Sequence, residues 1–294
     1  MYNLITILGP TAVGKTRLAA ELAYEFNGEI ISGDSRQVYK YMDIGTGKDL
    51  DDYKVKNKLI AYHLIDILEP SEEFNLFLFN KYFYEVYDKI IKSEKIPFLV
   101  GGTGLYVHSV LKKYDLKETA FSKSRVEELS RMTIEKLQSK LFKINPRLHN
   151  TTDLLIKDRI VSAIIIAEKE SAKEIESRKP MESLVIGVTN SREKIKQSIT
   201  NRLKFRLENG MIDEVKNLLK MGVSHDKLEF FGLEYKFLSL YLRGELTYNE
   251  MFEKLNIAIH QFSKRQMTWF RKMEREGVQI NWITSGDVQT AKTI

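Results

Sequence analysis

The sequence predicts an α/β protein in which helices flank a parallel β-sheet and an all-helical domain is inserted into the chain. Short apolar runs typical of buried strands alternate with longer stretches of helical periodicity, as they do in parallel sheets. A glycine-rich turn joins the first apolar run to the first helical stretch. The middle of the chain shows helical periodicity and no run typical of a strand.

The elements of the predicted core follow one another in alternation. The first strand covers residues 4–8 and the first helix residues 15–26, where Leu18, Leu22 and Phe26 recur at helical spacing. Further strands are predicted at residues 29–32, 62–67, 96–100 and 184–188. Further helices are predicted at residues 74–93, 191–207, 211–221 and 248–275.

The insertion separates two parts of this core. Apolar residues recur at helical spacing between Val126 and Leu141 and again in residues 155–166, and the strand pattern resumes only at residue 184. We therefore expect a first core part at residues 1–113, a helical insertion domain at residues 114–180, and a second core part at residues 181–294 with basic C-terminal helices.

Composition excludes several classes of protein. The 294 residues, 43% of them hydrophobic, are enough to bury a sizeable core. Without cysteine the chain forms neither disulfides nor zinc ribbons, and its five histidines are too far apart for a metal motif, so we expect any metal to be held by oxygen. No stretch reaches the ~18 apolar residues of a membrane span, and no secretory leader is recognisable at the N-terminus. We expect a cytoplasmic protein that binds no membrane.

A phosphate-binding loop follows the first predicted strand. It matches the pattern G-x-x-x-x-G-K-[ST] and consists of Gly9, Pro10, Thr11, Ala12, Val13, Gly14, Lys15 and Thr16. Its glycines allow backbone N–H groups to point at phosphate oxygens, Lys15 supplies a positive charge, and Thr16 offers a hydroxyl to Mg²⁺. The core should therefore be P-loop NTPase-like. The pattern leaves open whether the bound anion is a nucleoside triphosphate or another diphosphate.

Two polar residues are expected near this loop, because ligands of open parallel sheets bind beyond the carboxyl ends of the strands. Asp34 follows the second strand, where a carboxylate can orient magnesium or act as a general base, or alternatively cap its own loop. Thr103 lies in a Gly-Gly-Thr-Gly turn and can place its hydroxyl on a phosphate or leaving-group oxygen. The strand before that turn lacks the terminal acid common in nucleotide hydrolases, which disfavours an ATPase.

Positive charge is concentrated in two predicted helices. The chain holds 46 Lys and Arg against 40 Asp and Glu, a net charge of +6. Residues 187–206 contain six basic residues and one acid, and residues 260–275 contain five and one. Such helices can contact phosphates, and the interleaved Phe262, Trp269 and Phe270 either stack on bases or pack in the core.

Five strings together resemble the tRNA dimethylallyltransferase family: GPTAVGKT, DSRQVYKYMDIGTGK, HLIDI, LVGGTGLYVHSVL and KRQMTWFRKME. They cover nearly the whole chain in the expected order. The loop alone is generic, whereas the second and the last string are close to specific for this family and its adenylate-using relatives.

The resemblance implies transfer of a dimethylallyl group from dimethylallyl diphosphate to the N6 amine of the adenosine 3′-adjacent to the anticodon, position 37, in tRNAs that read codons beginning with U. The loop would bind the diphosphate with Mg²⁺ at Thr16, and Arg202 and Thr103 would assist its departure. Asp34 would take the proton of the attacking amine.

The resemblance also implies contacts with the anticodon stem-loop, whose target adenine is flipped into the site. The expected contact residues are Asp34, Ser35, Arg36, Gln37, Thr103, Arg125, Arg159, Lys264 and Arg265. Two departures indicate a divergent branch: Ser162 stands where relatives carry a second arginine, and residues 231–235 differ from the usual string. We expect a monomer.

Three other functions fit the loop and Asp34. A small-molecule kinase would use the same loop, magnesium and carboxylate. A non-catalytic, nucleotide-dependent RNA-binding switch would need no base, and a prenyltransferase acting on free AMP or ATP would have less use for basic helices.

Overall fold

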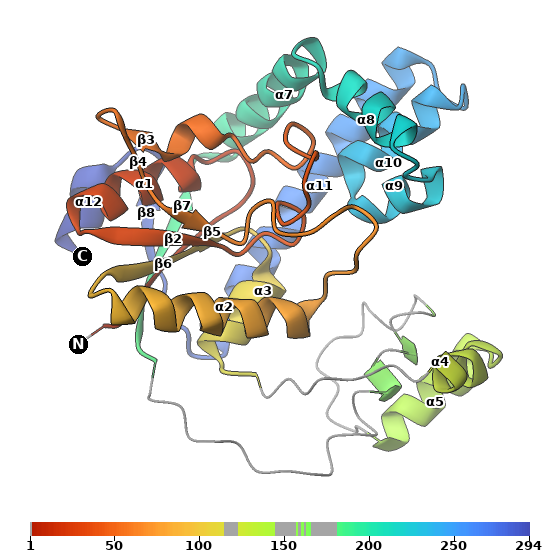
Figure 1. The fold of residues 1–294 in the computed structure, drawn as a ribbon, viewed down its shortest axis with the longest axis horizontal. Helices are drawn as coiled ribbons and strands as arrows, with labels where there is room; N and C mark the ends of the chain where they lie inside the picture. Colours follow the sequence, from red (N-terminus) through yellow and green to blue (C-terminus); the bar gives the residue numbers. More distant parts are fainter. Residues whose placement is uncertain (1, 115–122, 145–156, 158–159, 162, 166–180) are drawn as a thin grey trace. The chain divides into compact units, whose positions relative to one another are not determined.

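The computed structural model describes residues 2–114, 123–144, 157, 160–161, 163–165 and 181–294 (Figure 1). The chain divides into two compact units, one formed by residues 1–114 and 180–294 and the other by residues 115–179. In the part of the chain just given, none of the helices combines the length and apolar character that a membrane span requires.

The first unit is built on a six-stranded parallel sheet with the strand order β5-β2-β6-β1-β7-β8. The strands are β1 (Leu4–Leu8), β2 (Gly28–Ser32), β5 (Tyr62–His63), β6 (Ile96–Gly101), β7 (Ser183–Thr189) and β8 (Asn281–Thr284). The first strand lies between β6 and β7, and its last residue, Leu8, is in register with Gly101 and Gly187. The strand order therefore brings the phosphate loop beside the segments that follow β6 and β7.

Helices from both halves of the chain complete the first unit. They are α1 (Lys15–Glu25), α2 (Leu76–Lys92), α3 (Gly104–Leu111), α7 (Arg192–Glu208), α8 (Met211–Lys220), α9 (His225–Phe231), α10 (Leu233–Leu242), α11 (Tyr248–Arg275) and α12 (Val288–Thr293). A 3₁₀ helix, η1 (Leu50–Tyr53), precedes a small hairpin of β3 (Lys54–Val55) and β4 (Lys58–Leu59).

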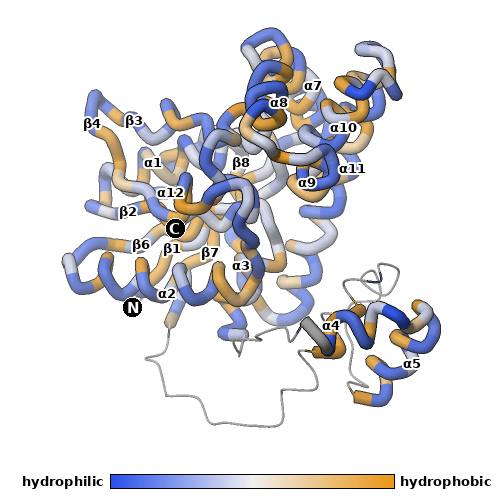
Figure 2. Tube along the Cα trace, turned by 45° about the vertical axis from the view of Figure 1, so that its right-hand side comes forward, coloured by the Kyte–Doolittle hydropathy of each residue, from blue (hydrophilic) through white to orange (hydrophobic). Residues whose placement is uncertain are grey.

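Buried strand residues alternate between two apolar clusters, because successive side chains of a strand point to opposite faces. Ile30 and Phe98 belong to the cluster that includes α1 and α12, whereas Ile31 and Leu99 belong to the one that includes α2, α3 and α11. Hydrophobic segments gather around the central strands β1, β6 and β7 in Figure 2. The predicted α/β class is thus confirmed, with helices on both faces of a parallel sheet.

The strand expected at residues 62–67 is wrong beyond His63, where β5 ends. Leu64 and Asp66 adopt positive φ angles of 62° and 54°, which interrupt the extended backbone. The segment turns because its backbone amides bond to the chain that follows β2: Asp66 N–H donates to the Gln37 carbonyl oxygen at 3.1 Å. Elements absent from the expectation include β8, α9, α10 and α12.

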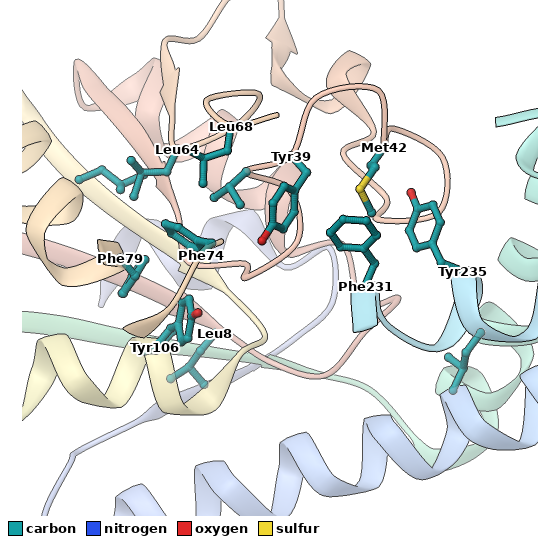
Figure 3. Close-up of a cluster of buried hydrophobic side chains, with 14 of the residues drawn as sticks. Leu8, Tyr39, Met42, Leu64, Leu68, Phe74, Phe79, Tyr106, Phe231 and Tyr235 are labelled. Carbon is teal, nitrogen blue, oxygen red and sulfur yellow. The ribbon is translucent and has the colours of Figure 1, made fainter. Parts of the chain in front are cut away.

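The junction between α9 and α10 packs against the chain that follows β2. Gly232 separates the two helices with a φ of 130°. Phe231, before it, lies between Tyr39 and Met42 in Figure 3, and Tyr235, after it, lies on the other side of Met42. The rings of Phe231 and Tyr39 meet edge to face at 4.9 Å. This contact anchors the segment after Asp34 at Tyr39.

The second unit has an apolar cluster of its own. Helices α4 (Lys123–Ser130) and α5 (Ile134–Ile144) lie where apolar periodicity predicts them. Their buried residues pack with described helical residues further along the chain, in a cluster made of Leu129, Leu137, Leu141, Ile160, Val161, Ile164 and Ile165.

Candidate active site

The phosphate loop has the backbone that its pattern predicts. Gly9 has a φ of 154°, and a Cβ there would lie 2.2 Å from the carbonyl oxygen of Val188, so only glycine fits. Gly14 caps α1 in the left-handed conformation, and no side chain caps the helix start. The first N–H groups of α1 are therefore available to an anion.

Two cations meet in this loop. The Lys15 ammonium donates to the Pro10 carbonyl oxygen at 2.7 Å, and the Arg202 guanidinium donates to the Thr11 hydroxyl. Burial, with Arg202 adding to it and Asp34 opposing it, lowers the pKa of Lys15 to about 7. Burial followed by the neighbouring Arg206 lowers the pKa of Arg202 to about 10. An anion would relieve this repulsion between like charges.

A cavity of about 680 Å³ opens beside the loop. The first core part and the second both line it, and the lining includes Thr11, Ala12, Gly14, Lys15, Thr16, Asp34, Ser35, Arg36, Gln37, Gly102, Thr103, Arg202, Phe262 and Gln266. The remaining predicted loop residues, Gly9, Pro10 and Val13, are buried and do not line it.

Asp34 lies directly beyond β2 and is fixed by its own loop. Its Oδ1 accepts the Arg36 backbone N–H at 2.8 Å, and the residue lines the same cavity as Lys15. The two interpretations offered by the sequence are therefore compatible, because the carboxylate caps its loop while facing the cavity. The nearby Gln37 uses both atoms of its side-chain amide. Its Oε1 accepts from the Ser32 hydroxyl at 2.9 Å, and its Nε2 donates to the Gly47 carbonyl oxygen at 3.0 Å.

Gln266 connects the phosphate loop to the turn after β6. Its Oε1 accepts the Thr11 backbone N–H at 2.8 Å, and its Nε2 donates to the Gly102 carbonyl oxygen at 2.9 Å. The adjacent Thr103 begins α3 without capping it through its side chain, so its hydroxyl is not used there. Gln266 lies within the string KRQMTWFRKME, and no pattern in the sequence predicts its role.

Glu214 of α8 is a second residue that sequence reasoning missed. Its carboxylate accepts the backbone N–H groups of Asp43, Ile44 and Gly45 at 2.7, 2.6 and 3.0 Å, and the Tyr235 hydroxyl at 2.7 Å. The loop that it holds continues into Gly47, whose carbonyl oxygen orients Gln37. Glu214 thus shapes one wall of the cavity without lining it.

Comparison with known proteins identifies the family. Residues 37–273 match the protein family described as IPP transferase, over more than half of the chain. The chain belongs to this family. It is 48% identical over 295 residues to tRNA dimethylallyltransferase 1 of Syntrophus aciditrophicus, with 99% of this chain and 97% of that protein covered. It is 50% identical over 281 residues to tRNA dimethylallyltransferase 1 of Geotalea uraniireducens, with 96% and 92% covered.

Solved structures of this family share the fold. The tRNA isopentenylpyrophosphate transferase of Bacillus halodurans superposes with a TM-score of 0.71 at 33% identity, with 100% of this chain and 93% of that chain covered. A eukaryotic dimethylallyltransferase has a TM-score of 0.78 at 24% identity, with 100% and 76% covered. The family expected from the five strings is confirmed.

The residues expected to contact RNA lie in different places. Lys264 and Arg265 are exposed on α11, the helix that brings Gln266 to the cavity. Arg125 lies on α4 in the second unit, where its guanidinium pairs with Glu128. Arg159 and Ser162 lie outside the described residues. The structure brings the expected catalytic residues Asp34, Thr103 and Arg202 into one cavity, and their roles stay predictions.

The three aromatic residues near the basic end of α11 separate into two kinds. Phe270 is fully buried, and Trp269 packs against Gly104, where a Cβ would lie 2.2 Å from the indole. These two belong to the core. Phe262 instead is 38% exposed and lines the cavity.

Proposed function

We propose that this member of the IPP transferase family transfers the dimethylallyl group of dimethylallyl diphosphate to the N6 amine of adenosine 37, next to the anticodon, in tRNAs that read codons beginning with U. The observation that carries the proposal is that Asp34 and Lys15 line one cavity of about 680 Å³, large enough for a diphosphate ester beside a purine. The two curated relatives described above are both named tRNA dimethylallyltransferase 1, which supports it.

The phosphate loop is the proposed site of the diphosphate. Lys15 and Arg202 supply the positive charge, and the free N–H groups at the start of α1 supply donors. As the allylic C–O bond breaks, negative charge accumulates on the departing diphosphate, and prearranged donors stabilise that charge most. Thr103 lines the cavity with a hydroxyl that its own helix does not use, and adds a further donor.

Asp34 is the proposed base toward the acceptor. The exocyclic amine of adenine is a weak nucleophile, so its attack on the prenyl carbon is assisted when a carboxylate takes the N–H proton. The N6–C bond forms, the C–O bond to the diphosphate breaks, the proton passes to Asp34 and diphosphate leaves. Asp34 is oriented for this role by its bond from the Arg36 N–H.

Magnesium fits the same cavity through oxygen donors. Within the described ranges no three His, Asp or Glu side chains gather to hold a metal unaided. The chain would contribute the Thr16 hydroxyl, which lines the cavity at the start of α1, while the diphosphate and waters complete the shell. When bound, the ion neutralises charge on the diphosphate.

The second substrate is proposed to be the anticodon stem-loop of tRNA, bound by a monomer. The exposed Lys264 and Arg265 lie on the helix whose side chains reach the cavity, so phosphates of an RNA whose adenine enters the cavity can be neutralised there. Arg125 and Arg159 are proposed as further contacts.

Transfer of label decides between this reaction and its rivals. Purified protein, Mg²⁺ and dimethylallyl diphosphate labelled in the prenyl group are incubated with an anticodon stem-loop carrying adenosine at position 37, with the same RNA carrying guanosine there, or with free AMP. We expect label in the first RNA alone. Label in AMP alone would establish the free-nucleotide reaction. No prenyl transfer in any of the three incubations would contradict the proposed function, and phosphoryl transfer from ATP to a small acceptor in a separate incubation would then identify a kinase.

A further inference from the structure

Three exposed phenylalanines lie on the helices of the second core part, in different surroundings. Phe205 on α7 is 62% exposed, Phe230 on α9 is 51% exposed and Phe262 on α11 is 38% exposed. Of these three, Phe262 alone lines the cavity. Since it is both exposed and part of the wall, its ring lies where the cavity meets solvent.

The position of Phe262 is fixed by its helix. Residues four apart in a helix lie on one face, and Gln266, one turn further on, bonds to the backbone of Thr11 and Gly102 at the base of the cavity. Ile259, one turn earlier, is buried in the same wall. Because Gln266 ties this helix to the phosphate loop, the position of the Phe262 ring relative to that loop is fixed.

The cations near these rings also differ. At Phe230, the Arg36 guanidinium lies 4.7 Å and the Lys227 ammonium 5.3 Å from the ring centre. This ring therefore already makes two cation–π contacts within the protein. The cation recorded at Phe262 is Arg265, at 5.9 Å, close to the ~6 Å limit of such contacts. Phe262 thus has a more distant cation at its ring than Phe230 has, and Lys264 and Arg265 are exposed beside it for phosphates.

We propose that Phe262 is a stacking platform for a nucleobase adjoining the adenine that enters the cavity. A base taken out of the anticodon loop leaves its neighbours without one stacking partner. Aromatic side chains replace such partners without reading sequence, because every base has a π-face. This inference rests on the proposed function, and it adds a contact that holds the RNA beside the flipped base.

Fluorescence of 2-aminopurine tests the stacking directly, because stacking quenches it. Two anticodon stem-loops carry the probe on the 5′ or the 3′ side of the target adenosine, and each is titrated with the full chain without prenyl donor. We expect quenching in one of the two RNAs with the natural protein and with Phe262→Tyr, and its loss with Phe262→Leu. Phe205→Leu is the matched control, since it removes an exposed ring that does not line the cavity, and it should quench as the natural protein does.

Steady-state kinetics tests the consequence. Phe262→Leu should raise the KM for RNA about 5- to 100-fold, as expected for the loss of one stacked base, with the KM for dimethylallyl diphosphate unchanged and with Phe262→Tyr near the natural value. Unchanged KM for RNA and unchanged quenching in Phe262→Leu would overturn the inference. A rise confined to the KM for dimethylallyl diphosphate would also overturn it, because the ring would then contact the prenyl chain.

The two proposals fail differently. If the natural protein binds the stem-loop with quenching but transfers no prenyl group, the proposed function is contradicted and the stacking proposal stands. A natural protein that transfers the group while Phe262→Leu behaves like it in both assays would contradict the stacking alone.

Discussion

Gln266 and Thr11 lie 255 positions apart in the sequence, and the side-chain oxygen of the first accepts the backbone N–H of the second at 2.8 Å. Through its other end, Gln266 donates to Gly102. One buried amide therefore sets the spacing between the loop proposed to hold the diphosphate and the turn that carries Thr103.

Replacing Gln266 by methionine should weaken both the fold and the reaction. The change keeps side-chain length and removes both hydrogen bonds. It leaves the buried Gly102 carbonyl oxygen unpaired, at a cost of about 1–3 kcal/mol, and the half-buried Thr11 N–H without its partner. Urea denaturation should show a lower free energy of unfolding, and kcat should fall. Gln261, exposed on the same helix, is the control, and Gln261→Met should change neither. Equal behaviour of the two variants would contradict the bridging role.

Replacing Asp34 by asparagine should lower kcat about 10²-fold or more, because the amide cannot take the proton of the amine. Asparagine keeps an oxygen for the Arg36 N–H, so the loop should hold its shape. Rapid-quench kinetics measures the transfer, and calorimetry with dimethylallyl diphosphate measures binding, which should persist. Near-natural transfer by Asp34→Asn would remove the base role.

The affinity for dimethylallyl diphosphate should fall as pH rises above about 7, the lowered pKa of Lys15. Below that pH the ammonium is already charged in the ligand-free protein. Above it, binding must first take up a proton, so affinity falls by up to about tenfold per pH unit. Calorimetry in buffers of different ionisation enthalpy measures the uptake at pH 8. The Lys15→Arg variant stays charged at pH 8 and should bind dimethylallyl diphosphate without taking up a proton. If this variant takes up as many protons as the natural protein does, a group other than Lys15 causes the pH dependence.

Replacing Glu214 by glutamine should loosen the loop at residues 43–45. The carboxylate accepts three backbone N–H groups and one hydroxyl, and an amide has one accepting atom in place of two. We expect a loss of about 1–3 kcal/mol in unfolding free energy and faster hydrogen exchange of those three amides. Glu208→Gln, an exposed change of the same kind at the end of α7, should leave both unchanged. Slow exchange preserved in Glu214→Gln would show that the loop holds itself.

Replacing Lys264 and Arg265 by alanine should weaken RNA binding and flatten its dependence on salt. Each lost phosphate contact should reduce the slope of log affinity against log salt by about 1. Filter binding of the stem-loop across salt concentrations measures this slope. The double variant Lys89→Ala with Lys92→Ala removes the same charge from exposed positions of α2 and should keep the natural slope. An equal effect of both pairs would mean that net charge, and not this helix, attracts the RNA.

The parts of the site that sequence predicts are those with local chemistry. The phosphate loop, Asp34 and Thr103 each follow directly on a strand, so their neighbourhood in space follows from the sheet. Arg202 was expected from family resemblance alone, and its hydrogen bond to Thr11 puts it in the same cavity. Gln266 and Glu214 act on backbone N–H and C=O groups, which every residue has, so their partners leave no pattern to find.

The same distinction applies to the fold. The long amphipathic helix Tyr248–Arg275 is predicted to the residue, whereas β8 spans four residues and owes its place to pairing with β7. The strand predicted through residue 67 ends at His63 because tertiary contacts override the local apolar pattern: the Asp66 N–H donates to the Gln37 carbonyl oxygen, and the Asp66 carboxylate pairs with the buried Lys48 ammonium.

The position of β1 between β6 and β7 has a consequence for biosynthesis. During translation, the strand that leads into the phosphate loop has one hydrogen-bonding edge unpaired until Ser183–Thr189 emerges from the ribosome. The hydrogen bond between Gln266 and the Thr11 N–H can form only after most of the polypeptide has been synthesised. A nascent chain halted at the insertion therefore has an unpaired edge on β1, and the cavity can be completed only after the C-terminal helices have been synthesised.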